Sequence, residues 1–191
     1  MHYRQSGEKK RALLGQRPVA VWMTGLPAAG KSTLASRLED CLLEKGYLTH
    51  WLDGDDLRSG LTSDLGFSQD EQQENIRRCA EVAKLLIGSS IITICTFLSP
   101  TQHLRSIARN IIGSPYFLEV YVNCPLAVCI QRDDKNMYGG ALRGQVTNLS
   151  GVNFPYEPPL QPWLELHTHY YSVEDSVKQL LKALLPLIEP L

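Results

Sequence analysis

The chain has 191 residues, of which 43% are hydrophobic, and its 19 basic and 20 acidic side chains give a formal net charge of -1. This length suits one domain with a sizeable core. Because the charges balance, there is no general attraction for nucleic acid or an anionic membrane, and small molecules are the expected partners. No apolar stretch is long enough to span a bilayer, and the first residues lack a signal-peptide pattern, so we expect a cytoplasmic protein.

Short apolar runs alternate with helical periods along the chain, which is typical of a parallel sheet covered by helices on both faces. We therefore predict an α/β fold with a doubly wound, five-stranded parallel sheet. Residues 1–17 are polar and basic and are expected to form an N-terminal arm, either frayed or a short packed helix. A single domain then covers residues 18–191. The expected strands are 18–24, 47–52, 90–96, 117–123 and 164–168, and the expected helices are 31–45, 69–88, 101–112, 125–132 and 173–186.

The segment 133–162 is rich in Gly and Pro, has little periodicity and is too long for an ordinary connection. Such a segment predicts a lid or a binding loop, with a simple surface excursion as the alternative. The cysteines lie in apolar patterns without metal-type spacing, so we interpret them as reduced core thiols. They are Cys41, Cys79, Cys95, Cys124 and Cys129.

A complete phosphate-binding loop of the form GxxxxGK[S/T] follows the first expected strand and opens the first expected helix of the domain. Its glycines let backbone NH groups turn toward phosphate oxygens, and the helix adds the positive end of its dipole. Lys31 can reach the β and γ phosphates and Ser32 can ligate magnesium. The pattern therefore predicts a site for a nucleoside triphosphate, with the P-loop of a kinase-like domain. The expected contacts are Gly25, Leu26, Pro27, Ala28, Ala29, Gly30, Lys31, Ser32 and Thr33.

Three carboxylates follow the second expected strand, and Arg58 comes directly behind them. Ligands bind outside the carboxyl ends of the strands in this class of sheet. A carboxylate there can accept the proton of an attacking hydroxyl or hold a magnesium-bound water, and Arg58 can bind an anionic group. A helix N-cap is the alternative, and it explains one aspartate. The three are Asp53, Asp55 and Asp56.

Two further segments carry candidate side chains. Ser99 follows the third expected strand, where its hydroxyl can face a ligand, or where it can cap the next helix with Pro100 at the first helical position. Ser68 predicts the N-cap of a long helix. Phe67, just before it, can stack on a base, although a lone aromatic residue is more often part of a core.

These segments together resemble the adenylylsulfate kinases, a family of P-loop kinases, from about Arg11 to Leu187. The resemblance implies transfer of the γ-phosphoryl group of ATP, with Mg²⁺, to the 3′-hydroxyl of adenylyl sulfate. It is also compatible with a homodimer. The matching stretches are 12–16, 25–32, 52–55, 65–68, 74–78, 97–100, 119–122 and 155–157.

The resemblance assigns roles to individual residues. Asp55 would orient or deprotonate the 3′-hydroxyl, Asp53 would support the magnesium site, and Arg132 would lie on the adenine of ATP. Ser99 occupies a position described for the family as a phosphoserine intermediate, although a direct in-line transfer needs no enzyme nucleophile. The residues implied to contact the acceptor are Asp55, Arg58, Phe67, Asn75, Leu98, Ser99 and Leu149.

The chain departs from the family pattern on the acceptor side. Gln72 replaces an arginine, Gly139 and Gly140 replace lid lysines, and Leu149 replaces the second aromatic that would sandwich adenine. A lost charged contact costs about 1.5–3 kcal/mol, and a lost stacking face costs about 1–3 kcal/mol. A related kinase with another acceptor therefore remains an alternative. A non-catalytic nucleotide-binding protein is a third interpretation, which the retained Lys31 disfavours.

Overall fold

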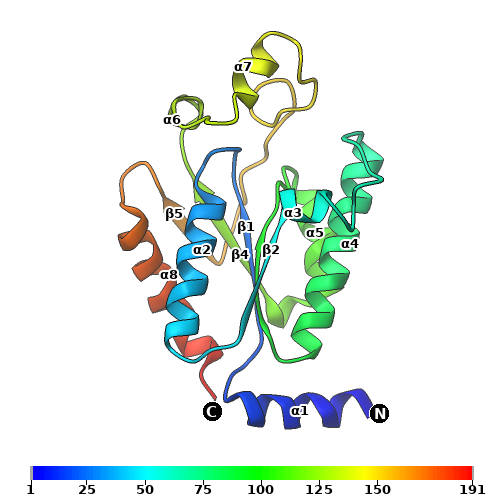
Figure 1. Ribbon diagram of the computed structural model, residues 1–191, viewed down its shortest axis with the longest axis vertical. Coiled ribbons are helices and arrows are strands. Elements are labelled where there is room, and N and C mark those ends of the chain that lie inside the picture. Colours follow the sequence, from blue (N-terminus) through cyan, green and yellow to red (C-terminus); the bar gives the residue numbers. More distant parts are fainter. Residues whose placement is uncertain (1, 191) are drawn as a thin grey trace.

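The computed structural model describes residues 2–190, and a five-stranded, all-parallel sheet forms its centre (Figure 1). The strand order is β2-β3-β1-β4-β5, and every neighbouring pair is parallel. This arrangement confirms the predicted fold class. The central strands β1 and β3 are buried along their whole length, which explains their continuous apolar runs. The strands are β1 (Ala20–Thr24), β2 (Thr49–Asp53), β3 (Ile92–Thr96), β4 (Phe117–Asn123) and β5 (Leu164–His167).

Helices cover both faces of the sheet, and each face has its own hydrophobic core. On one face α2 (Lys31–Glu44) packs against α8 (Val173–Ile188), and on the other α4 (Gln69–Gly88) packs against α5 (Gln102–Ile112). Figure 1 shows these two pairs on opposite sides of the strands. Trp22, on β1, is fully buried in the core beneath α4 and α5.

Local capping fixes where the helices begin. The Ser68 hydroxyl accepts from the backbone NH of Glu71, whose carboxylate accepts from the Ser68 NH, so the predicted cap of α4 is a full capping box. Helix α5 is instead capped by Thr101, whose side chain accepts from the Leu104 NH. The alternative that Ser99 caps this helix is therefore wrong, because the cap lies two residues later.

Five further elements complete the chain. Helix α6 lies within the expected helix 125–132, and α1 is the helical alternative for the N-terminal arm. The short elements α3, α7 and η1 were not predicted. The five elements are α1 (His2–Leu14), α3 (Gly54–Arg58), the 3-10 helix η1 (Ser114–Tyr116), α6 (Leu126–Gln131) and α7 (Met137–Leu142).

The carboxyl ends of the strands carry the P-loop, α3 and the segment with α6 and α7, which form the upper end of Figure 1. Helix α1 lies at the opposite end of the sheet. Gln16, just after α1, is buried and donates to the carbonyl oxygens of Leu48 and Ser90, which fixes this end of the chain to the amino-terminal edges of β2 and β3. The five cysteines are free thiols, four of them buried. None of the helices in residues 2–190 is long and apolar enough to cross a membrane.

Candidate active site

The P-loop turns sharply between β1 and α2 because two glycines allow it. Gly30, the N-cap of α2, has φ +101°, which L side chains rarely adopt. At Gly25 a Cβ atom would lie 2.5 Å from the carbonyl oxygen of Val122, so only glycine fits beside β4. The loop therefore presents its backbone NH groups and the start of α2 in the arrangement that binds phosphates.

Lys31 lies inside this loop and is partly buried. Its Nζ donates to the carbonyl oxygens of Gly25 and Leu26, both at 2.9 Å. Burial lowers the pKa of Lys31 from 10.5 to about 8, although the nearby Cys129, Asp53 and Asp55 oppose this change. The Lys31 ammonium group is thus poorly solvated, and the negative oxygens of a bound triphosphate would offset the cost of keeping it charged.

Ser32 and Asp53 meet at the ends of α2 and β2. The Ser32 hydroxyl donates to Asp53 Oδ2 at 2.8 Å, and Thr96 on β3 donates to the same oxygen at 2.8 Å. The other oxygen, Asp53 Oδ1, accepts from the Asp55 NH at 2.9 Å and caps α3. The N-cap interpretation therefore holds for Asp53. One carboxylate oxygen stays beside the P-loop hydroxyl, as a magnesium-bound water would require.

Asp55 follows in the first turn of α3, and its carboxylate is 72% exposed. It forms an ion pair with Lys135 from the segment after α6. This hydrogen bond and the charge of Asp55 raise the pKa of Lys135. Because exposed ion pairs contribute only about 0–1 kcal/mol, a charged ligand can displace Lys135 and use the carboxylate.

Arg58, at the end of α3, and Phe67, just before α4, lie next to each other. The Arg58 guanidinium lies 4.3 Å from the centre of the Phe67 ring, whose residue is 58% exposed. The Phe67 carbonyl oxygen accepts from Gln72 at 2.9 Å and from Asn148 at 3.2 Å. Gln72 therefore holds the loop that carries Phe67. Asn75 lies one turn further along α4, is buried, and its Oδ1 has no hydrogen-bond partner within the described chain.

Ser99 differs from the expectation of an accessible hydroxyl. The residue has no exposed surface, and its Oγ accepts from the Trp22 indole NH at 3.1 Å. Its carbonyl oxygen accepts from Thr24 and from Arg105. Ser99 is therefore buried between β1 and α5, where its contacts hold the loop between β3 and α5. Leu98, in contrast, is 38% exposed beside it.

Leu149 also differs from its expected role. Its exposed fraction is 5%, and it belongs to the hydrophobic core that includes Tyr138. A side chain buried in this way offers no face to a ligand. The departure from the family pattern at this position is therefore a change in the packing of the lid, and it gives no direct measure of an acceptor pocket.

Two glycines of the predicted lid, residues 133–162, have close side-chain neighbours. At Gly139 a Cβ atom would lie 2.1 Å from Asn136 Oδ1, and at Gly140 it would lie 3.1 Å from the Val146 side chain. Tyr138, directly before these two glycines, is fully buried, and its hydroxyl donates to the carbonyl oxygen of Pro27 at 2.9 Å. Helix α7 is thereby fixed directly to the P-loop.

Arg132 ends α6 and lies next to the other side of the P-loop. Its guanidinium donates to the carbonyl oxygen of Thr168 at 2.9 Å, and the Thr168 hydroxyl donates to the carbonyl oxygen of Ala29 at 2.8 Å. His169, the next residue, has a buried Nδ1 without a partner in the described chain. Arg132 is thus connected through Thr168, in the loop after β5, to Ala29 of the P-loop.

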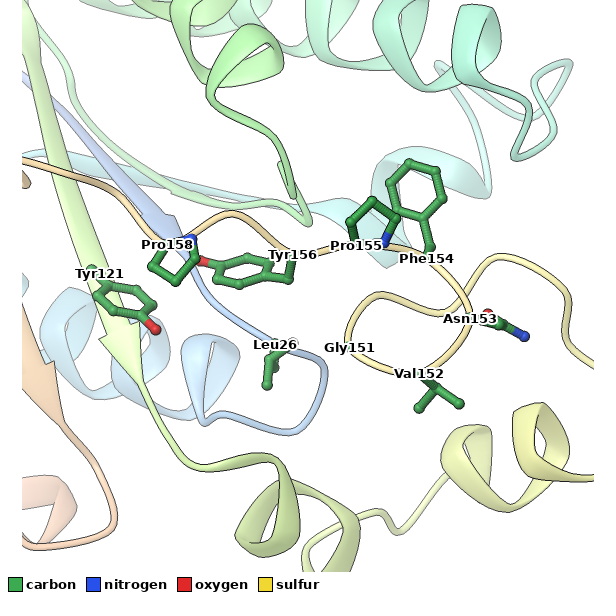
Figure 2. A pocket seen from close by; sticks show the side chains of 9 residues that line it. All are labelled: Leu26, Tyr121, Gly151, Val152, Asn153, Phe154, Pro155, Tyr156 and Pro158. Atoms are coloured by element: carbon green, nitrogen blue, oxygen red, sulfur yellow. The ribbon is translucent and has the colours of Figure 1, made fainter.

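A cavity of about 530 Å³ opens between the P-loop and the returning part of the lid. Figure 2 shows Leu26 on one side and the curved segment from Gly151 to Pro158 around it. The stacked rings of Tyr121 and Tyr156, whose centres are 6.2 Å apart, are part of its lining. The cavity is lined by Leu26, Tyr121, residues 151–156 and Pro158.

The fold and the loop together define a P-loop kinase. An all-parallel sheet carries a complete phosphate-binding loop, a hydroxyl–carboxylate pair at the second strand and an exposed carboxylate on α3. The family model for adenylylsulphate kinase matches residues 17–167. The chain belongs to the adenylylsulfate kinase family.

Individual relatives agree with this assignment. The chain is 49% identical over 182 residues to an adenylyl-sulfate kinase of Bacteroides thetaiotaomicron, which covers 95% of this chain and 90% of the relative. It is 50% identical over 169 residues to one of Halothermothrix orenii, covering 88% and 90%. The solved Mycobacterium tuberculosis APS kinase in complex with AMPPNP and APS superimposes with a TM-score of 0.85 at 37% identity, covering 88% of this chain and 98% of that one.

Sequence reasoning missed four residues that shape the site: Trp22, Arg105, Lys135 and Tyr138. Trp22 stood inside an apolar run and gave only a strand signal, although an indole NH in a core needs a buried acceptor. Lys135 and Tyr138 stood in the lid without periodicity. Arg105 is 3% exposed on α5, and its charge in a helix that faces the core was the one available signal.

Proposed function

We propose that this protein transfers the γ-phosphoryl group of ATP to the 3′-hydroxyl of adenylyl sulfate. The observation that carries the proposal is the convergence of Lys31, the Ser32–Asp53 pair and Asp55 at the carboxyl ends of β1 and β2. The chain belongs to a family named for this reaction. Phosphoryl transfer depends on positioning and on charge stabilisation, and these residues supply both.

Each residue has a proposed part in the transfer. Lys31 exchanges its two carbonyl acceptors for phosphate oxygens and neutralises charge that develops on them. Asp55 accepts the proton of the acceptor hydroxyl once Lys135 has moved away. Arg58 binds an anionic group of the acceptor while Phe67 offers its ring to the base.

Mg²⁺ fits the residues present. Ser32 Oγ and a carboxylate oxygen of Asp53 lie 2.8 Å apart, and hard oxygen ligands of this kind suit magnesium, which keeps several of its waters. When bound there it would neutralise charge on the phosphates. Ser32 with Asp53 is therefore the candidate site for this ion, and no cluster of three His, Cys, Asp or Glu side chains that could hold a metal occurs between residues 2 and 190. The cytoplasmic location and the homodimer expected from the sequence stay predictions.

An acceptor screen tests the function. The protein is incubated with ATP and Mg²⁺, and ADP release is followed with adenylyl sulfate, with other nucleotides and with simple alcohols. We expect adenylyl sulfate to give the highest kcat/KM. Release with another acceptor alone would favour the related kinase with a different acceptor, an alternative supported by Gln72, which holds the Phe67 loop in place of a charged contact. No release with any acceptor would favour a non-catalytic role.

A further inference from the structure

The free face of Phe67 suggests that a second wall completes the acceptor site. Arg58 covers one face of the Phe67 ring at 4.3 Å, and 58% of the residue remains exposed. A planar base can stack on the uncovered face. A base held on one side only keeps its other face in water, so the side chain that lies opposite determines how strongly the base is bound.

Leu149 does not provide this wall, because it is buried in the lid core. The segment that follows it does pass along the cleft. At one end the Asn148 side chain donates to the Phe67 carbonyl oxygen at 3.2 Å. At the other end the Glu157 NH donates to the Pro100 carbonyl oxygen at 2.8 Å. Residues 148–157 thus run from the Phe67 loop to the loop before α5.

Phe154 is the aromatic residue in the middle of this span, and its backbone is firmly held. Its NH donates to the Leu149 carbonyl oxygen at 3.1 Å, and its carbonyl oxygen accepts from the Gly151 NH at 2.8 Å. Figure 2 shows its ring on the opposite side of the segment from Leu26 and Val152. The ring is only half-buried and belongs to neither hydrophobic core. A partly exposed phenylalanine on a fixed backbone loses little entropy when a ligand stacks on it.

We propose that Phe154 is the second aromatic wall of the acceptor site and stacks on the adenine of the acceptor opposite Phe67. This inference rests on the proposed function and assigns acceptor specificity to a residue outside the positions implied by the family resemblance. The lid carries Phe154, so the base becomes enclosed when the returning segment lies against the Phe67 loop. Phe154 is then a binding residue, and it takes no part in proton or phosphoryl transfer.

Steady-state kinetics with adenylyl sulfate test the proposal on three variants. Phe154→Leu removes the aromatic face and keeps an apolar side chain, whereas Phe154→Tyr keeps the ring. Leu160→Ala is the matched control, because Leu160 lies in the same returning segment and is 80% exposed. We expect Phe154→Leu to raise the KM for adenylyl sulfate by roughly 5- to 150-fold, the range that one stacked base represents. The KM for ATP should stay unchanged, and Phe154→Tyr and Leu160→Ala should resemble the parent.

The outcomes separate this inference from the function on which it rests. No turnover of adenylyl sulfate by the parent protein would refute the proposed function, and with it an adenine wall for that acceptor. An active parent whose acceptor KM changes less than twofold in Phe154→Leu would overturn the role of Phe154 alone. A parallel rise in the KM for ATP together with a lower melting temperature, without rescue by Phe154→Tyr, would show that Phe154 is structural and would also overturn it.

Discussion

Lys31 is expected to destabilise the protein that it serves, and the effect should depend on pH. Its ammonium group is poorly solvated in the P-loop, and its pKa falls from 10.5 to about 8 because of burial. A fall of this size corresponds to about 3 kcal/mol when the charged group is taken from water into the loop. Because the side chain is only partly buried, we take about 1–3 kcal/mol as the expected cost.

The sign of the effect follows from proton binding. Below pH 8 Lys31 is charged in both the folded and the unfolded chain, so the folded protein carries the full cost. Between pH 8 and 10.5 the unfolded chain holds a proton that the folded chain has released, so the free energy of unfolding rises with pH. Above this range the cost has disappeared. Lys31→Met has no proton to release and lacks this rise.

Urea unfolding at a series of pH values from 7 to 10.5 measures the difference. All other titrating groups occur in both proteins, so the parent should gain about 1–3 kcal/mol relative to Lys31→Met across this range. Lys45→Met, which removes an exposed lysine just after α2, controls for the loss of a lysine. Lys31→Met should also release no ADP, whereas Lys45→Met should release it like the parent. Stability curves for the parent and Lys31→Met that stay parallel over the whole range would refute the reasoning.

Four further substitutions separate chemistry from packing. Asp55→Asn should lower turnover by roughly 10²- to 10⁴-fold with little change in the ATP KM, and turnover within a few-fold of the parent would make Asp55 a structural residue of α3. Leu149→Phe should overfill the lid core and lower the free energy of unfolding by about 1–3 kcal/mol; an unchanged stability with a lower acceptor KM would restore Leu149 to the acceptor wall. Arg105→Met should lower the free energy of unfolding by up to about 3–5 kcal/mol, because Glu119 loses its buried partner at 2.8 Å. Arg109→Met removes a 43% exposed partner of Glu119 and should lower it by less than about 1 kcal/mol. Equal losses in these two variants, measured by urea unfolding, would contradict the assigned burial.

The sheet and the P-loop were predictable because their signals are local and strong. Each buried strand needs an apolar run of about five residues, and the expected ranges contain four of the observed strands completely and β2 except for Asp53. The loop needs glycine at Gly25, where β4 leaves no room for a Cβ atom, and at Gly30, where the backbone is left-handed. Steric requirements of this kind are visible in the sequence itself.

The acceptor side was harder to predict because its contacts come from distant parts of the chain. Ser99 seemed available at the end of a strand, yet the Trp22 indole NH, 77 residues away, takes its hydroxyl as an acceptor. Leu149 seemed to mark a lost aromatic contact, yet the lid folds it inward beside Tyr138. Neither contact produces a periodic pattern in the sequence. The motifs therefore predicted where Ser99 and Leu149 lie along the chain but not the direction in which their side chains point.

The segment 133–162, which the sequence predicts to be a lid, contacts both halves of the proposed site. Tyr138 joins α7 to Pro27 of the P-loop, and Asn148 joins the next stretch to Phe67. Each of these single hydrogen bonds contributes about 0.5–1.5 kcal/mol, and the exposed Lys135–Asp55 pair contributes about 0–1 kcal/mol. The contacts are therefore strong enough to place the lid and weak enough to rearrange. In the proposed reaction, a phosphate that drew Lys135 away from Asp55 would free this carboxylate for the acceptor hydroxyl.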